Sequence, residues 1–390
     1  MNIIDSHPWL AERYRRLLMW GWRRLKGIDP EKVVFSCFQG RAYGDNPRFI
    51  SERLHERYPK AKIVWLFNRA ALNRLQGKLP DYIRCVEYKR HGALMELATA
   101  RVWVDNFTKH SFLRWPKGRQ FYVQTWHGDR PIKKICYDIG IPGDRRIEER
   151  CDRVVSGSEF GERVYRTAFR YRGAFIGEGC PRNDMLVKND PKQRRRIRES
   201  LGVGEEIRLL LYAPTYRENT AVIPRRAQMD LARTLNCLEM TTGDQWVCLY
   251  RAHYLSEGID LQAVKDRIID VTAYPEMSEL LLAADMLLTD YSSCAFDYIL
   301  TGRPALFFAS DWEEYLSTRG VYFDIHDAPL MLAEDQEGLE GLIRELTPER
   351  IRQNCQSLRE YFGCHETGRA TDAVCDYIIE RLGSKQRIED

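Results

Sequence analysis

The chain alternates short apolar segments with amphipathic ones, and it does so in two successive series. In the first series, apolar segments of strand length span 32–38, 62–67, 100–106, 120–126, 153–158 and 174–177. In the second series they span 207–213, 246–252, 268–271, 286–289 and 304–309. Amphipathic stretches, such as 48–57 and 91–100, lie between several of these segments. Strands and helices in alternation predict an α/β fold, with parallel sheets covered by helices.

A charged stretch, 188–200, separates the two series and contains Asn189-Asp190-Pro191, a sequence typical of a turn. We therefore expect a first Rossmann-like domain over 29–187 and a second over 188–390, whose last part, 337–382, is helical. Two doubly wound domains predict a ligand in the cleft between them, at the carboxyl ends of the strands.

Residues 1–28 are expected to contribute a separate basic amphipathic helix. Apolar residues recur at helical spacing within 8–26, and six arginines and lysines there stand against one acid, Glu12. A basic helix with tryptophans on its apolar side predicts binding to an anionic membrane surface. The alternative is a helix that packs on its own domain, with its arginines in water.

Bulk composition narrows the class of protein. Hydrophobic residues make up 44% of the chain, and the net charge of +4 gives no indication of a nucleic-acid partner. The 11 cysteines form no CxxC pair, which favours reduced thiols over a disulfide framework or a zinc site. We expect neither a signal peptide nor a membrane-spanning helix, because no long uninterrupted apolar run is present.

The most informative stretch is 288–298, where an apolar strand runs into a helix through Ser292 and Ser293. A strand-to-helix junction directs free backbone N–H groups at its surroundings, and serine hydroxyls add further donors. The junction therefore predicts a phosphate site. The alternative is that Ser292 only caps the helix.

His127 and Gly128 follow another apolar strand, and a histidine at a strand end is suited to act as a general base near neutral pH. The alternative is a packed structural histidine. Lys133, a little further on, adds positive charge near this strand end. Further polar strand ends supply the remaining candidates for the cleft, namely Arg182, Asn183, Thr215, Arg217, Arg251 and His253.

Taken together, these segments resemble the CDP-glycerol glycerophosphotransferase family, which includes teichoic acid primases and polymerases. The resemblance covers roughly residues 100 to 330 and is specific as a set of blocks in a fixed order. The blocks are Trp126-His127-Gly128, Pro181-Arg182-Asn183-Asp184, Tyr212-Ala213-Pro214-Thr215-Tyr216-Arg217, Thr289-Asp290-Tyr291-Ser292-Ser293, Arg303-Pro304, and Arg319-Gly320-Val321-Tyr322-Phe323-Asp324.

The resemblance implies a GT-B-like fold and transfer of a polyol phosphate, from CDP-glycerol or CDP-ribitol, to a lipid-linked or polymeric acceptor with release of CMP. It implies that His127 and His253 are catalytic. It implies that Ser292 and Ser293 bind phosphate and that Thr215 and Arg217 lie on the donor side. We further expect substrate binding by Arg251, Asp290, Arg182, Asn183 and Lys133. It also implies a cytoplasmic enzyme held peripherally at the inner face of the membrane, in teichoic acid or capsule synthesis.

Two features depart from the family pattern: Asp129-Arg130 stands between His127-Gly128 and Pro131, and 325–330 lacks the usual proline- and glycine-rich sequence. No paired carboxylates predict an obligatory protein-bound metal, although Mg²⁺ can accompany the diphosphate. The alternatives are a GT-B glycosyltransferase or epimerase that uses a nucleotide sugar, and an inactive membrane-associated binding protein.

Overall fold

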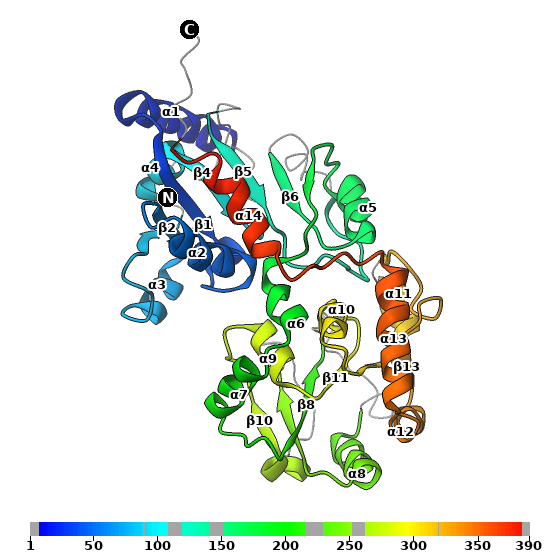
Figure 1. Ribbon diagram of the computed structural model, residues 1–390. Helices are drawn as coiled ribbons and strands as arrows, with labels where there is room; N and C mark the ends of the chain where they lie inside the picture. Colours follow the sequence, from blue (N-terminus) through cyan, green and yellow to red (C-terminus); the bar gives the residue numbers. More distant parts are fainter. Residues whose placement is uncertain are drawn as a thin grey trace.

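The computed structural model describes residues 8–88, 90–107, 119–140, 151–215, 229–251, 262–318 and 320–383. Two parallel β-sheets, each with helices around it, form two domains joined by crossing segments (Figure 1). The first sheet has the order β3-β2-β1-β4-β5-β6-β7 and the second β10-β9-β8-β11-β12-β13, with every strand pair parallel. Both orders reverse direction beside a central strand, as doubly wound folds do.

The strands of the first sheet are β1 Asp29–Ser36, β2 Lys62–Phe67, β3 Arg84–Glu87, β4 Ala100–Asp105, β5 Phe121–Gln124, β6 Arg153–Val155 and β7 Phe175–Ile176. Those of the second are β8 Arg208–Ala213, β9 Trp246–Tyr250, β10 Ile268–Asp270, β11 Met286–Thr289, β12 Ala305–Phe308 and β13 Met331–Ala333.

The α-helices are α1 Pro8–Lys26, α2 Asp45–Arg57, α3 Arg69–Leu75, α4 His91–Thr99, α5 Glu159–Ala168, α6 Asp184–Lys188, α7 Pro191–Ser200, α8 Leu231–Thr242, α9 Met277–Ala283, α10 Cys294–Tyr298, α11 Trp312–Thr318, α12 Gln336–Arg344, α13 Pro348–Tyr361 and α14 Ala370–Ile379. Two 3₁₀ helices adjoin short α-helices: η3 Pro181–Asn183 precedes α6, and η6 Ile299–Thr301 follows α10. Several helices begin where a side chain accepts from a first-turn N–H, as Ser158 does for α5 and Asp190 for α7.

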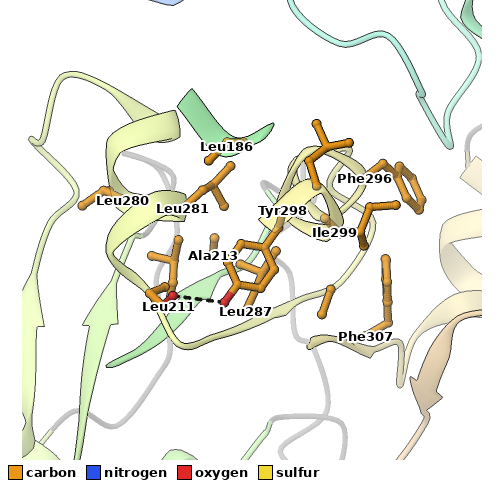
Figure 2. Close-up of a cluster of buried hydrophobic side chains, with 14 of the residues drawn as sticks. Leu186, Leu211, Ala213, Leu280, Leu281, Leu287, Phe296, Tyr298, Ile299 and Phe307 are labelled. Atoms are coloured by element: carbon orange, nitrogen blue, oxygen red, sulfur yellow. Dashed lines mark hydrogen bonds between the residues drawn. The ribbon is translucent and has the colours of Figure 1, made fainter. Parts of the chain in front are cut away.

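Helix α10 is anchored in the core of the second domain. Figure 2 shows Phe296 and Tyr298 among leucines from the strands and from α9. Both aromatic rings are fully buried, and each contributes roughly 1.5–3 kcal/mol through its removal from water. The turn that precedes α10, with Ser292 and Ser293, is thereby fixed to rigid structure.

The sequence predicted the α/β class and the central strands, and the structure confirms both. It missed β3 and β13, which lie at sheet edges. Strand β3 is half polar, and β13 has only three residues. Both therefore lack the continuous apolar run by which buried parallel strands are recognised.

The domain boundaries differ from the prediction in two places. The stretch 188–200 is mostly helix α7, and Met185 and Leu186 of α6 already belong to the second core, so the crossing lies before α6. At the other end, α14 packs beside α2, with Val374 and Cys375 in the core of the first domain (Figure 1). The chain therefore crosses between domains twice, because the apolar face of α14 completes the first core.

Helix α1 packs on α4, with Met19 buried and Leu18 and Trp22 partly buried against the first domain. One face of α1 therefore packs on the first domain, as the alternative to membrane binding describes. Within the described residues, no helix has both the length and the apolar character needed to span a bilayer.

Candidate active site

His127 lies at the carboxyl end of β5, in a loop shaped by unusual backbone. Trp126, just before it, has φ of +48°. In the separate segment that follows β1, Phe38, Gln39 and Asp45 also have positive φ. A non-glycine residue in this region costs about 1–2 kcal/mol. Strain of this kind is often stored at functional sites, where the surrounding structure holds it.

The His127 ring is fixed in one tautomer. Its Nδ1 lies 2.7 Å from the carbonyl oxygen of Asn106, at the end of β4. Since a carbonyl only accepts, Nδ1 carries the proton and Nε2 carries the lone pair. Phe107 stacks on the ring at 5.5 Å and Phe38 meets it edge-on at 5.3 Å.

Burial lowers the pKa of His127, and the bond to Asn106 offsets this only in part. The positive charges of Arg182 and Lys133 lower its pKa further. The imidazole is therefore neutral at pH 7, with its Nε2 lone pair able to take a proton. A neutral, oriented histidine is what a general base requires.

The second domain contributes the ends of β8 and β11, which are neighbours at its own reversal point. Both carboxylate oxygens of Asp290 accept from the backbone N–H of Thr215, at 2.9 and 3.1 Å, and Oδ1 also accepts from the N–H of Tyr291 at 2.6 Å. Asp290 is buried, and its carboxylate positions the backbone of Thr215.

Ser292 and Ser293 stand at the edge of this turn and are half-buried. Ser292 Oγ accepts from the N–H of Cys294 at 3.4 Å, a long capping bond, while Ser293 makes no side-chain cap. Both serines are therefore placed to offer hydroxyls to a ligand, as the phosphate prediction requires.

The two strand ends meet across the cleft. A methyl group added at Gly128 would lie 3.2 Å from Ser293 Oγ. Arg251, at the end of β9, donates from Nη1 to the carbonyl of Tyr274 at 2.8 Å and keeps Glu276 and Cys294 among its electrostatic neighbours. The structure thus places Gly128, next to His127, against the turn of Ser292 and Ser293, and it places Arg251 near Cys294 at the end of the same turn.

Lys133 lies near this group, and its backbone forms a bridge with Val321 of the second domain. Among the described residues there is no cluster of three or more histidine, cysteine or acidic side chains that would hold a metal. His253 and Arg217, predicted as catalytic and substrate-binding, lie outside the described residues.

Two residues predicted to bind substrate make internal contacts in the structure. The guanidinium of Arg182 is occupied by Asp45, Asp297 and the His127 carbonyl. The Asn183 amide is fully buried and donates to Asp297 and Glu366. Both side chains thus join the two domains, and their contact with a substrate stays a prediction.

Sequence reasoning missed Asn106, Phe38 and Phe107, which surround His127. Asn106 follows an apolar strand, so its place at a strand end was the available signal. The two phenylalanines carry no such signal, because an aromatic residue after a strand is more often part of a core.

The two parallel sheets, with strand ends of both domains meeting at Gly128 and Ser293, define a two-domain, GT-B-like fold. The family model described as CDP-Glycerol:Poly(glycerophosphate) glycerophosphotransferase matches residues 18–380. The chain belongs to this family, as its motifs predicted.

Among curated relatives, the teichoic acid poly(glycerol phosphate) polymerase of Bacillus spizizenii is 29% identical over 94% of this chain and 98% of the relative. A polymerase of the same name from Staphylococcus epidermidis is 31% identical over 90% of this chain, which spans only 51% of that longer protein. The solved wall teichoic acid polymerase TagF is 28% identical, with a TM-score of 0.82 over 96% of this chain and 95% of that one.

Proposed function

We propose that this enzyme transfers glycerol phosphate from CDP-glycerol to a hydroxyl of a lipid-linked or polymeric acceptor, with release of CMP, in teichoic acid synthesis. One observation carries the proposal. His127, a neutral base with a fixed tautomer, is followed by Gly128, and a Cβ added at Gly128 would lie 3.2 Å from Ser293 Oγ in the Ser292–Ser293 turn.

The reaction follows from this placement. The acceptor hydroxyl attacks the β-phosphorus, a new P–O bond forms, and the bond to the bridging oxygen breaks so that CMP leaves. Nε2 of His127 takes the acceptor proton, which contributes typically about 10²–10⁴-fold. Positioning and charge stabilisation supply most of the remaining rate enhancement in phosphoryl transfer.

The donor's diphosphate is assigned to the second domain. The hydroxyls of Thr215, Ser292 and Ser293 are suited to bind phosphate oxygens, and the guanidinium of Arg251 is suited to balance their charge. Lys133 adds positive charge on the acceptor side. His253 and Arg217 remain predicted participants on sequence grounds, and Mg²⁺ remains a predicted companion of the diphosphate.

The assay that tests this function measures nucleotide release from purified protein given CDP-glycerol, CDP-ribitol or UDP-sugars, each with a membrane extract as acceptor. We expect CMP release with CDP-glycerol, dependent on acceptor. CMP release with CDP-ribitol alone would mean that the donor carries ribitol instead of glycerol. UDP release would instead support the nucleotide-sugar alternative, and binding without turnover would support an inactive binding protein.

We further propose that α1 holds the enzyme at the cytoplasmic face of the membrane. Opposite the face that packs on α4, Leu17, Trp20 and Leu25 are 68%, 58% and 79% exposed. Arg13 and Arg24 are exposed on the same helix. An apolar stripe among arginines is suited to an anionic lipid interface.

Co-sedimentation with vesicles tests this location. We expect binding to phosphatidylcholine vesicles that contain phosphatidylglycerol, and a loss of binding in a Leu17→Ser/Trp20→Ser variant. Met240→Ser on α8, where the side chain is 88% exposed, is the matched control and should leave binding unchanged. Equal binding by all three proteins would contradict the assignment.

A further inference from the structure

A buried cluster of charged side chains lies behind the cleft, where the chain crosses between domains. At its centre is Asp297 of α10, which is 4% exposed. Its Oδ2 accepts from Arg182 Nη2 at 2.7 Å. Its Oδ1 accepts from Arg130 Nη2 at 2.9 Å and from Asn183 Nδ2 at 3.0 Å. One carboxylate of the second domain therefore receives three donors from the chain that precedes it.

The same arginines hold the His127 loop. Arg182 Nη1 donates to the carbonyl oxygen of His127 at 2.8 Å and to Asp45 Oδ2 at 3.1 Å. The buried Arg130 lies in the loop itself and also donates to Glu366 Oε1 at 3.1 Å. Asp297 is thus connected to the backbone of His127 through one side chain.

Charge makes this connection strong. Burial alone would raise the pKa of Asp297, but Arg182 and Arg130 outweigh it and hold the pKa below its ordinary value. The carboxylate is ionised, and hydrogen bonds between ionised partners are shorter and stronger than neutral ones. The distance of 2.7 Å to Arg182 is in that range.

We propose that Asp297 is a positioning residue for the transfer reaction: through Arg182, it fixes the His127 loop at the separation from the Ser292–Ser293 turn that the reaction requires. The inference rests on the proposed function. The separation is small, since a Cβ at Gly128 would lie 3.2 Å from Ser293 Oγ. A displacement of about 1 Å between reacting groups can lower a rate by about 10²-fold.

The test is Asp297→Asn, which keeps the shape of the side chain and removes its charge. We expect kcat for CMP release to fall about 10–100-fold, while the Kd for CDP-glycerol, measured by calorimetry, stays within about threefold of wild type. The split between kcat and Kd separates positioning from loss of folded protein.

Asp285→Asn is the matched control. Asp285 also accepts from arginines, namely Arg194 at 2.7 Å, Arg198 at 3.1 Å and Arg208 at 3.2 Å, and its side chain is 11% exposed. All four residues lie in the second domain, and Asp285 precedes β11, at the opposite end of that strand from Ser292 and Ser293. We expect this variant to lower the melting temperature and to retain wild-type kcat per folded molecule.

Arg182→Lys is a second variant that keeps the buried positive charge. A lysine lacks the planar fork that reaches Asp297 and the His127 carbonyl together, so kcat is again expected to fall about tenfold with an unchanged Kd. Wild-type kcat in this variant, or in Asp297→Asn, would overturn the inference, as would an equal loss in Asp285→Asn. A wild-type enzyme that releases no CMP would instead refute the proposed function.

Discussion

The two sheets have corresponding strand orders, but different kinds of side chain follow the carboxyl ends of their strands. Beside the reversal point of the first, at the end of β5, a neutral histidine is enclosed by Phe38 and Phe107, and its backbone surroundings are strained. At that of the second, the Asp290 carboxylate accepts from the backbone N–H of Thr215, and the half-buried Ser292 and Ser293 follow in the turn before α10. The same topology thus presents an enclosed histidine at the edge of one sheet and a turn with two serines at the edge of the other, and we propose a proton acceptor at the first and an anion site at the second.

This comparison assigns one task to each domain. The first domain should govern the rate of the chemical step, and the second should govern how tightly the donor binds. Variants on the two sides are therefore expected to affect different kinetic quantities, and each experiment below separates them.

The largest expected effect is on the first domain. His127→Gln removes the proton acceptor, and we expect kcat to fall by about 10²–10⁴-fold because a positioned base contributes that much. Single-turnover CMP release measures the loss. His55→Gln, where the ring stacks on Tyr82 at 3.7 Å in the same domain, is the control and should retain wild-type kcat. A fully active His127→Gln enzyme would exclude this base.

The next effect is on the second domain. Ser292→Ala and Ser293→Ala each remove a hydroxyl predicted to bind the diphosphate, and a hydrogen bond to a charged group is worth about 1.5–3 kcal/mol. We expect the Kd for CDP-glycerol to rise about tenfold or more in each variant, as measured by calorimetry. Ser357→Ala on α13 serves as the control. Unchanged donor affinity in both variants would place the diphosphate elsewhere.

The pH dependence of the reaction tests the dry environment of His127. Since burial lowers its pKa below the ordinary 6.5, we expect kcat/KM to stay level through neutral pH and to fall only at lower pH. Phe107→Ala admits water, raises the pKa of His127 towards 6.5 and should move the acidic limb upward. An acidic limb above pH 6.5 in the wild-type enzyme would contradict the burial argument.

The same pKa shift has a consequence for stability. Below pH 6.5 the unfolded chain binds a proton at His127 that the folded protein resists, so the free energy of unfolding should fall as the pH falls through this range. Phe107→Ala should weaken this dependence.

The smallest expected effect concerns the contact between the domains. Gly128→Ala places a methyl group 3.2 Å from Ser293 Oγ, which requires a shift of a few tenths of an ångström, so we expect kcat to fall about 3–10-fold. Gly341→Ala on α12, with nothing near the added methyl group, is the control. An unaffected Gly128→Ala enzyme would mean that the two strand ends tolerate displacement.

Much of this architecture could be predicted because buried parallel strands carry continuous apolar runs. His127 and Ser292 were found for a related reason: each follows such a run, and parallel topology brings strand ends to one edge. The edge strands β3 and β13 were not predictable, because one is half polar and the other has only three residues. The return of α14 to the first domain was not predictable either, because neither periodicity nor turn chemistry indicates which sheet a helix covers.

Arg182 and Asn183 show the limit of reasoning from residue type. A cation and an amide at a domain junction are equally suited to a ligand or to buried partners, and their buried partners here, Asp297 and Glu366, lie far away in sequence. Asn106 shows the converse, since it acts on His127 through its backbone carbonyl, a group that every residue carries.

The measurement that tests the division of tasks most directly is a calorimetric titration of CDP-glycerol into the His127→Gln enzyme. If the first domain supplies only the proton acceptor and the second holds the donor, the Kd should lie within about threefold of the wild-type value. A Kd weakened about tenfold or more would show that His127 binds the donor, and it would contradict the account.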